Sequence, residues 1–171
     1  MFCAFHFDLD QDMMTNSVPT APLPDETAVR GYAGDIDPKL AWDILSRERD
    51  AVLVDVRTNA EWGFVGLPDL SSVGKQPVTV EWQGLPAMAR NPNFDSETKD
   101  ALTQLNATPD SAVIFICRSG ARSRDAAISL TRLGYKRCYN LAGGFEGDLD
   151  DARHRGGRNG WKFCGLPWKQ S

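Results

Sequence analysis

One cysteine of this chain stands where an apolar run ends and a short basic segment begins. The sequence FICRSGARSR occupies residues 115 to 124, so Cys117 is followed at once by three arginines, two serines and a glycine. Neighbouring positive charge favours a thiolate over a thiol, and the thiolate is the nucleophilic form of cysteine. The alternative is a buried core cysteine followed by a solvated basic turn. The composition of the segment favours the nucleophile.

The small residues after Cys117 predict a tight loop that binds an anion. We expect Cys117 to end a central strand and Ser123 to begin the next helix, with the loop folded over the helix N-terminus. Backbone N–H groups of such a loop turn inward, and the helix dipole adds positive potential there. Ser119, Gly120 and Ala121 leave room for this turn. Such surroundings can lower a cysteine pKa from about 8.5 to roughly 3.5–7.5, so we expect a reactive thiolate at neutral pH.

Three charged residues of the same segment have different expected positions. Arg122 can turn back into the loop, whereas Arg124 is expected in solvent. Asp125 falls in the first turn of the helix, where it suits the helix dipole but would repel a nearby thiolate. We therefore expect the Asp125 side chain to point into solvent.

Strand-like and helix-like segments alternate around this loop. Short apolar runs predict strands at 51–57, 111–117 and 137–143, with a possible strand at 78–82. Periodic apolar residues predict helices at 37–49, 96–105 and 123–134. Such alternation predicts a parallel α/β sheet, whose active end lies at the carboxyl ends of its strands.

Four further polar residues lie at or just after the end of the first predicted strand. Asp55 and Arg57 end this strand, so they should lie near Cys117 at the active end of the sheet. Thr58 and Glu61 have the spacing of a capping box, which predicts a short helix directly after the strand.

Length and composition exclude several functional classes. The 171 residues suit one domain with tails: a disordered or extended tail at 1–28, a domain at 29–152, and a Gly- and Trp-rich extension at 153–171 that packs on the domain. The net charge of −4 provides no global basic surface for nucleic acid or an acidic membrane. No apolar run approaches the roughly 20 residues of a membrane span, and the acidic start is unlike a signal peptide. We expect a cytoplasmic protein.

The other cysteines indicate neither a disulfide framework nor a metal site. Cys3, Cys138 and Cys164 share no CxxC spacing with one another or with Cys117, and the two histidines of the chain are far apart in the sequence. We expect free thiols and no bound metal.

Three segments together resemble the rhodanese family of sulfurtransferases. CRSGARS at 117–123 is similar to the family's active-site loop, DVRTNAEW at 55–62 to its Asp-Val-Arg segment, and NLAGGF at 140–145 to its closing Leu-x-Gly-Gly element. They occur in the family's order, and the likeness covers about residues 30 to 150. The resemblance implies a three-layer α/β domain with a central, mostly parallel five-stranded sheet flanked by helices.

The resemblance also implies covalent catalysis without a cofactor. Cys117 would take a sulfane sulfur from an anionic donor such as thiosulfate, hold it as a persulfide, and pass it to a cyanide, thiol or protein-thiol acceptor. The loop residues that would hold the persulfide are Arg118, Ser119, Gly120, Ala121, Arg122 and Ser123, with Arg122 helping to neutralise it. Asp55, Arg57 and Glu61 would support the loop, with Arg57 paired to Glu61.

The likeness has one departure, which lies after the predicted short helix. Many family members carry Gly-His-Ile-Pro-Gly-Ala where this chain has VGLPDL at 65–70, so Gly66 stands at the His position and Asp69 at a Gly position. We infer altered packing near the site and a retained nucleophile. The stretch 71–95 is longer than a minimal domain needs and is expected to form a lid or a substrate-side loop.

The C-terminal extension has alternative roles. Trp161 and Trp168 either dock on the edge of the domain or form a wall of the substrate pocket. Cys164 would resolve a persulfide if it lay close to Cys117.

Other activities of the same fold are separated by loop length and by the cysteine itself. Phosphatases of this fold have five residues between Cys and Arg, whereas four separate Cys117 from Arg122, which favours a ring of amides sized for sulfur. Binding or regulatory modules of the family commonly lack the cysteine, so its presence favours an enzyme. A persulfide carrier within a larger complex would use the same residues and is an open alternative.

Overall fold

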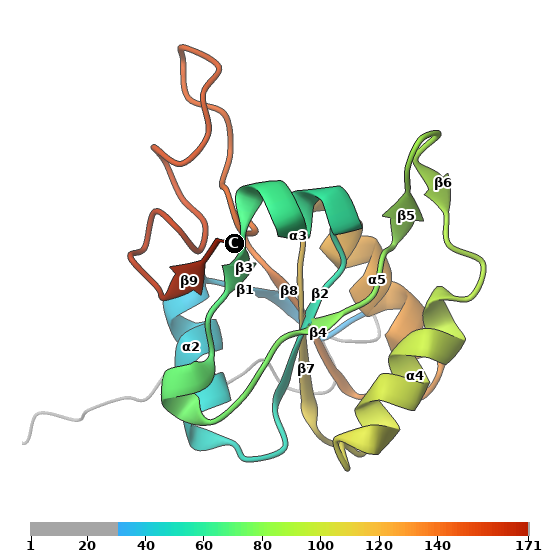
Figure 1. Ribbon diagram of the computed structural model, residues 1–171. Helices are drawn as coiled ribbons and strands as arrows, with labels where there is room; N and C mark the ends of the chain where they lie inside the picture. Colours follow the sequence, from blue (N-terminus) through green and yellow to red (C-terminus); the bar gives the residue numbers. More distant parts are fainter. Residues whose placement is uncertain (1–30, 171) are drawn as a thin grey trace, which may run out of the picture.

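A parallel sheet forms the centre of the computed structural model, which describes residues 31–170 (Figure 1). Its strand order is β1-β8-β7-β2-β4, and every neighbouring pair is parallel. The strands are β1 (Gly34–Ile36), β8 (Arg137–Leu141), β7 (Ala112–Ile116), β2 (Val52–Asp55) and β4 (Val78–Thr79). The predicted five-stranded α/β sheet is confirmed, with its strongest predicted strand, β7, at the centre.

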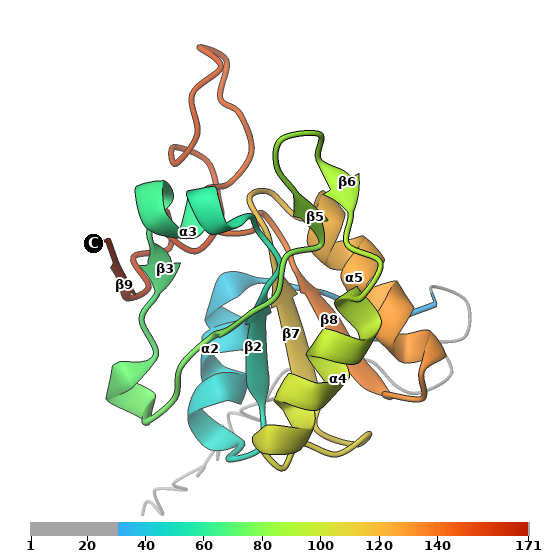
Figure 2. The same cartoon turned by 45° about the vertical axis from the view of Figure 1, so that its right-hand side comes forward.

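Helices cover both faces of this sheet and give three layers. The helix α2 (Pro38–Arg47) lies on one face, and α4 (Phe94–Gln104) and α5 (Ala121–Arg132) lie on the other (Figures 1 and 2). The short helix α3 (Asn59–Val65) follows β2 near the carboxyl ends of the strands. Two hydrophobic cores result, because alternate residues of β7 face opposite layers: Val113 and Phe115 on the α4 and α5 side, Ile114 and Ile116 on the α2 side.

Two helix starts follow the sequence prediction. Asp37 caps α2, because its carboxylate accepts hydrogen bonds from the amides of Lys39 and Leu40. Thr58 and Glu61 form the predicted capping box at the start of α3.

The other two helices begin two residues earlier than expected. The helix α4 begins at Phe94 instead of Ser96, because the Phe94 side chain is fully buried and packs edge to face on Trp82. The helix α5 begins at Ala121 instead of Ser123, directly after Gly120, whose φ of +111° turns the chain into the helix. Ser123 therefore lies inside the first turn of α5.

The C-terminal segment packs against the α2 side of the domain. Trp161 is fully buried, contacts Trp42 edge to face, and donates from Nε1 to the carbonyl of Pro167 at 2.7 Å. Residues Trp168–Lys169 form β9, which pairs antiparallel with β3 (Leu67–Pro68). The loop between Trp161 and β8 projects from the same end of the molecule as α3 (Figures 1 and 2).

This packing explains the glycine at position 66. Gly66 has a φ of +96°, and a Cβ there would lie 2.5 Å from the carbonyl oxygen of Lys169. The strand β9 therefore occupies the space that a larger side chain would need. In this chain the VGLPDL segment packs against the C-terminal strand.

The stretch 71–95 contains a short 3-10 helix and a hairpin. The 3-10 helix is Ser71–Val73, and the hairpin pairs β5 (Gln83–Gly84) with β6 (Ala89–Arg90). No helix within residues 31–170 is long and apolar enough to cross a bilayer. The predicted tail at 1–28 and Cys3 lie outside the described residues.

Candidate active site

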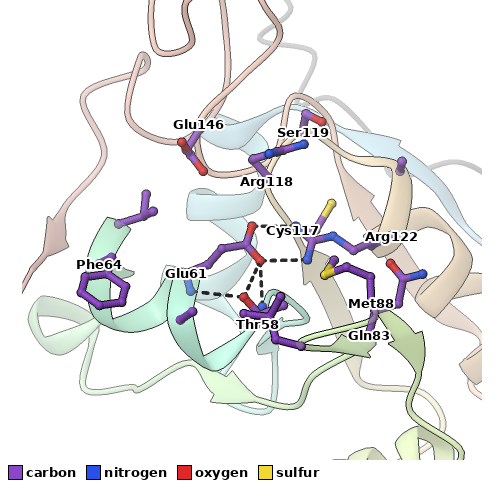
Figure 3. A pocket seen from close by; sticks show the side chains of 14 residues that line it. Thr58, Glu61, Phe64, Gln83, Met88, Cys117, Arg118, Ser119, Arg122 and Glu146 are labelled. Carbon is purple, nitrogen blue, oxygen red and sulfur yellow. Dashed lines mark hydrogen bonds and ion pairs between the residues drawn. The ribbon is translucent and has the colours of Figure 1, made fainter.

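Cys117 lies directly after β7, at the carboxyl end of the central strand, and is only 2% exposed. It lines a cavity of about 610 Å³ together with residues of its own loop, of α3 and of the β5–β6 hairpin (Figure 3). The expectation that Cys117 lies at the carboxyl end of a central strand agrees with this position, and the loop between β7 and α5 covers residues 117–120.

Two hydrogen-bond donors approach the Cys117 sulfur. The amide of Gly120 lies 3.1 Å from Sγ and the hydroxyl of Ser123 lies 3.2 Å from it. The amide can reach Sγ because Gly120 adopts a positive φ, and Ser123 reaches it from the first turn of α5. The sulfur is therefore approached by one backbone donor and one side-chain donor.

The NLAGGF segment and Glu146, which follows it, bind the same loop through backbone hydrogen bonds. The amide of Phe145 donates to the Cys117 carbonyl at 2.7 Å, and the amide of Glu146 donates to the Arg118 carbonyl at 2.9 Å. Gly144 makes this approach possible, because a Cβ at that position would lie 2.4 Å from the Cys117 carbonyl oxygen. A glycine is therefore required for the loop to dock on the segment that follows β8.

Arg122 is paired with Glu61 across the cavity. Its two terminal nitrogens bind the two Glu61 carboxylate oxygens at 2.8 and 2.7 Å (Figure 3). Burial acts to raise the pKa of Glu61, but hydrogen bonds from Arg122 and Thr58 outweigh it and lower the pKa to about 2. Burial acts to lower the pKa of Arg122, but Glu61 and the nearby Cys117 outweigh it and raise this pKa. Glu61 thus holds the guanidinium beside the cavity.

Arg57 does not pair with Glu61, which corrects the sequence prediction. Arg57 and Asp55 are both fully buried and form a two-point ion pair, with Nε 2.9 Å from Oδ1 and Nη2 2.6 Å from Oδ2. Arg57 also donates to the Gly66 carbonyl and stacks on the Phe145 ring, 4.1 Å from its centroid. A buried guanidinium requires a buried counter-charge, whereas the capping box keeps Glu61 at the start of α3.

The charged residues at the mouth of the cavity are less constrained. Arg118 is exposed and lines the cavity, and no ion pair or side-chain hydrogen bond holds it among the described residues. Ser119, Ala121 and Glu146 also line the cavity. Asp125 is exposed beside Arg124, as expected.

An apolar wall faces the loop across the cavity. Phe64 of α3 is 81% exposed, and Leu85 and Met88 of the hairpin are 60% and 40% exposed. Part of the stretch that was expected to form a substrate-side loop therefore lines the cavity (Figure 3).

The C-terminal candidates lie elsewhere. Neither Trp161, Trp168 nor Cys164 lines the cavity that contains Cys117. Cys138 is buried in the core, where burial raises the pKa of its thiol to about 12. Among residues 31–170, no three His, Cys, Asp or Glu side chains gather closely enough to ligate a metal ion.

Sequence reasoning missed two residues behind the sulfur. Asn140 accepts a hydrogen bond from Ser123 at 2.6 Å and donates to Asp35 at 2.8 Å. Asn140 belongs to the NLAGGF segment. The available signal was a polar side chain inside a strand that is otherwise mostly buried and apolar.

Comparison with known proteins places this chain among characterised and uncharacterised relatives. Residues 37–150 match the family described as the rhodanese-like domain. The crystal structure of Rv0390 from M. tuberculosis is 50% identical and superposes with a TM-score of 0.73, over 82% of this chain and 99% of that one. An uncharacterized Rickettsia rickettsii protein, a homolog of RP600, is 39% identical over 129 residues, which are 75% of this chain and 91% of the relative. A sulfurtransferase of Allochromatium vinosum is 29% identical over 110 residues, 64% of this chain and 82% of the relative.

Proposed function

The chain belongs to the rhodanese-like domain family, and we propose that it is a sulfurtransferase that carries sulfur as a persulfide on Cys117. The observation that carries this proposal is the pair of donors, the Gly120 amide and the Ser123 hydroxyl, that converge on the Cys117 sulfur beside an open cavity. A nucleophilic thiolate needs such donors because they stabilise its charge without blocking its approach to a substrate.

In the loading step the Cys117 thiolate attacks the outer sulfur of an anionic donor. With thiosulfate, a bond forms between Sγ and that sulfur, the sulfur–sulfur bond of thiosulfate breaks, and sulfite leaves with the electron pair. Arg118 is suited to attract such an anion, because it is exposed at the cavity and no side-chain partner holds it among residues 31–170.

In the unloading step an acceptor removes the outer sulfur. A thiolate or cyanide ion attacks this sulfur, the bond between it and Sγ breaks, and Sγ leaves as a thiolate with the electron pair. The Gly120 amide then stabilises the same charge as in the resting enzyme. The division of one transfer into two displacements predicts ping-pong kinetics.

The decisive experiment is incubation with thiosulfate followed by intact-mass measurement. Wild-type protein should gain the mass of one sulfur atom, and the gain should disappear in Cys117→Ser. Cys138→Ser and Cys164→Ser are matched controls, because neither residue lines the cavity, and both should load normally. Failure of the wild type to load from thiosulfate and from a polysulfide donor would contradict the proposal.

A second measurement separates an enzyme from a carrier or a binding module. Loaded protein that turns over repeatedly with cyanide or a small thiol is an enzyme. Protein that loads once but transfers sulfur only within a larger complex is a persulfide carrier, and protein that never loads is a binding module. The four residues between Cys117 and Arg122 weigh against a phosphatase.

A further inference from the structure

A hydrogen-bond chain leads from the Cys117 sulfur to the edge strand of the sheet. The Ser123 hydroxyl lies 3.2 Å from Sγ and 2.6 Å from Oδ1 of Asn140. Asn140 donates from Nδ2 to Oδ1 of Asp35 at 2.8 Å, and the Tyr32 hydroxyl donates to the same oxygen at 2.8 Å. The parallel register of β1 and β8 places Asp35 directly beside Asn140.

The chemistry of Asp35 determines which way the Asn140 amide points. An ionised carboxylate only accepts hydrogen bonds, so the NH₂ group of Asn140 must face Asp35. The Asn140 oxygen then faces Ser123. Because Asn140 is 5% exposed and Ser123 is fully buried, bulk water cannot easily replace either partner.

The Ser123 hydroxyl therefore serves two acceptors with one proton. It can donate either to Oδ1 of Asn140 or to Sγ of Cys117, and the two choices suit different states of the sulfur. In the persulfide, Sγ is an uncharged divalent sulfur and accepts weakly, so the proton goes to Asn140. In the free thiolate, Sγ is charged, and donating to it leaves the buried Asn140 oxygen without a partner, which carries a cost.

We propose that Asn140, oriented by Asp35, is a positioning residue that biases Cys117 toward its sulfur-loaded form. It does so by competing with the thiolate for the Ser123 proton. This inference rests on the proposed sulfurtransferase function. Asn140 does not touch the reacting sulfur, so its influence must pass through Ser123.

Neither ion pair near Sγ includes Ser123. Arg122 is paired with Glu61 of α3, and the Asp55 and Arg57 pair lies beneath. Other charged or titratable groups near the loop are Arg118 and Glu146 at the cavity, exposed Asp125 on α5, and Tyr32 beside Asp35.

The test is the loading equilibrium, in which free enzyme and thiosulfate form persulfide enzyme and sulfite. Intact mass gives the ratio of persulfide to free enzyme at known thiosulfate and sulfite concentrations. The equilibrium constant obtained in this way is the loading constant. The pH is set where iodoacetamide reactivity of the reduced enzyme has reached its upper plateau, so that unloaded Cys117 is anionic. Asn140→Leu should lower the loading constant by about five- to tenfold, the effect of one buried hydrogen bond. In a Ser123→Ala background the same Asn140→Leu change should alter it by less than about twofold.

Asp35→Asn provides a second variant at an exposed position, in case Asn140→Leu fails to fold. The new side-chain amide at position 35 can donate as well as accept, so the Asn140 side-chain amide can flip and turn its NH₂ group toward Ser123. This change should also lower the loading constant, by a smaller factor. An unchanged loading constant in both variants, or an Asn140→Leu effect of equal size in the Ser123→Ala background, overturns the role of Asn140 alone. A wild-type enzyme that never loads overturns the sulfurtransferase proposal and this inference with it.

Discussion

The cavity has two walls of opposite character. On one side, the Cys117 loop is held by backbone hydrogen bonds from the segment after β8 and by donors from Gly120 and Ser123. On the other side, α3 and the β5–β6 hairpin present Phe64, Leu85 and Met88, which are apolar and exposed. In the first wall the loop backbone and the donors to the sulfur are hydrogen-bonded within the domain, whereas the second wall leaves apolar surface in contact with solvent.

This difference separates two tasks within one cavity. The hydrogen-bonded wall positions the sulfur, and substitutions there should reduce both stability and the proposed sulfur transfer. Phe64 of the apolar wall has little part in the fold, because it is 81% exposed. Changes to it should alter only the molecules that the cavity accepts.

Removing the buried cation beneath the sulfur loop should be the most damaging change. Arg57→Met leaves the Asp55 carboxylate fully buried without its partner, so we expect a loss of about 3–5 kcal/mol in the free energy of unfolding, measured by urea denaturation. The matched control is Arg137→Met, because Arg137 pairs with Glu48 and both side chains are about one-third exposed. That loss should be about 1 kcal/mol or less, and equal losses in the two variants would contradict this interpretation of the buried pair.

A single methyl group at Gly144 should disrupt the hydrogen-bonded wall. Gly144→Ala brings a Cβ against the Cys117 and Arg118 backbone, so we expect a loss of about 2–4 kcal/mol in stability together with slower persulfide loading. Gly74→Ala is the control, since Gly74 has a similar positive φ but no atom within 4 Å of an added Cβ. It should cost about 1 kcal/mol and leave loading unchanged. Normal loading by Gly144→Ala would show that the loop does not depend on this close approach.

The pair between Glu61 of α3 and Arg122 of α5 joins the two walls and should make the free energy of unfolding depend on pH. The folded-state pKa of Glu61 is about 2, below its ordinary value of 4.5, so the carboxylate stabilises the fold above pH 4.5 and this contribution is lost as pH falls toward 2. At pH 7 the free energy of unfolding of the wild type should exceed that of Glu61→Gln by about 1–3 kcal/mol. Chemical denaturation from pH 7 to pH 2 should show the difference shrinking across that window, and a difference independent of pH would exclude the ionised pair as its source.

The apolar wall should affect acceptor use alone. Phe64→Ala should change stability by no more than about 0.5 kcal/mol, because the side chain is 81% exposed. We expect it to raise KM severalfold for an aromatic thiol acceptor and to leave persulfide loading from thiosulfate unchanged. Phe163→Ala is the control, since Phe163 is also exposed but does not line the cavity. If Phe64→Ala slowed loading as much as acceptor use, the division between the two walls would fail.

Local sequence patterns were reliable where a feature depends on residues close in the chain. The capping box of Thr58 and Glu61 spans three residues, and the loop after Cys117 depends on small residues that follow it directly. The ion pairs were harder to predict. Arg57 has carboxylates at positions 55 and 61, and sequence alone does not show which of them is buried beside it.

The contacts between residues far apart in the sequence could not be predicted from such patterns. Asn140 and Asp35 are 105 positions apart, and Glu61 and Arg122 are 61 apart. Each pair meets only because strand order and register bring its elements together. The same holds for Gly66. It adopts a positive φ and packs against β9, a strand about one hundred residues further along the chain.

The sequence alone predicts the candidate nucleophile, the small loop around it and the parallel sheet on which they lie. These follow from local conformational preference and from the period of buried residues, which act over short distances along the chain. Tertiary structure alone decided which charges pair beneath and across the cavity, which side chains form its apolar wall, and which amide lies behind Ser123. These contacts depend on packing and strand register, because the residues that they join are far apart in the sequence and no local pattern indicates that they meet.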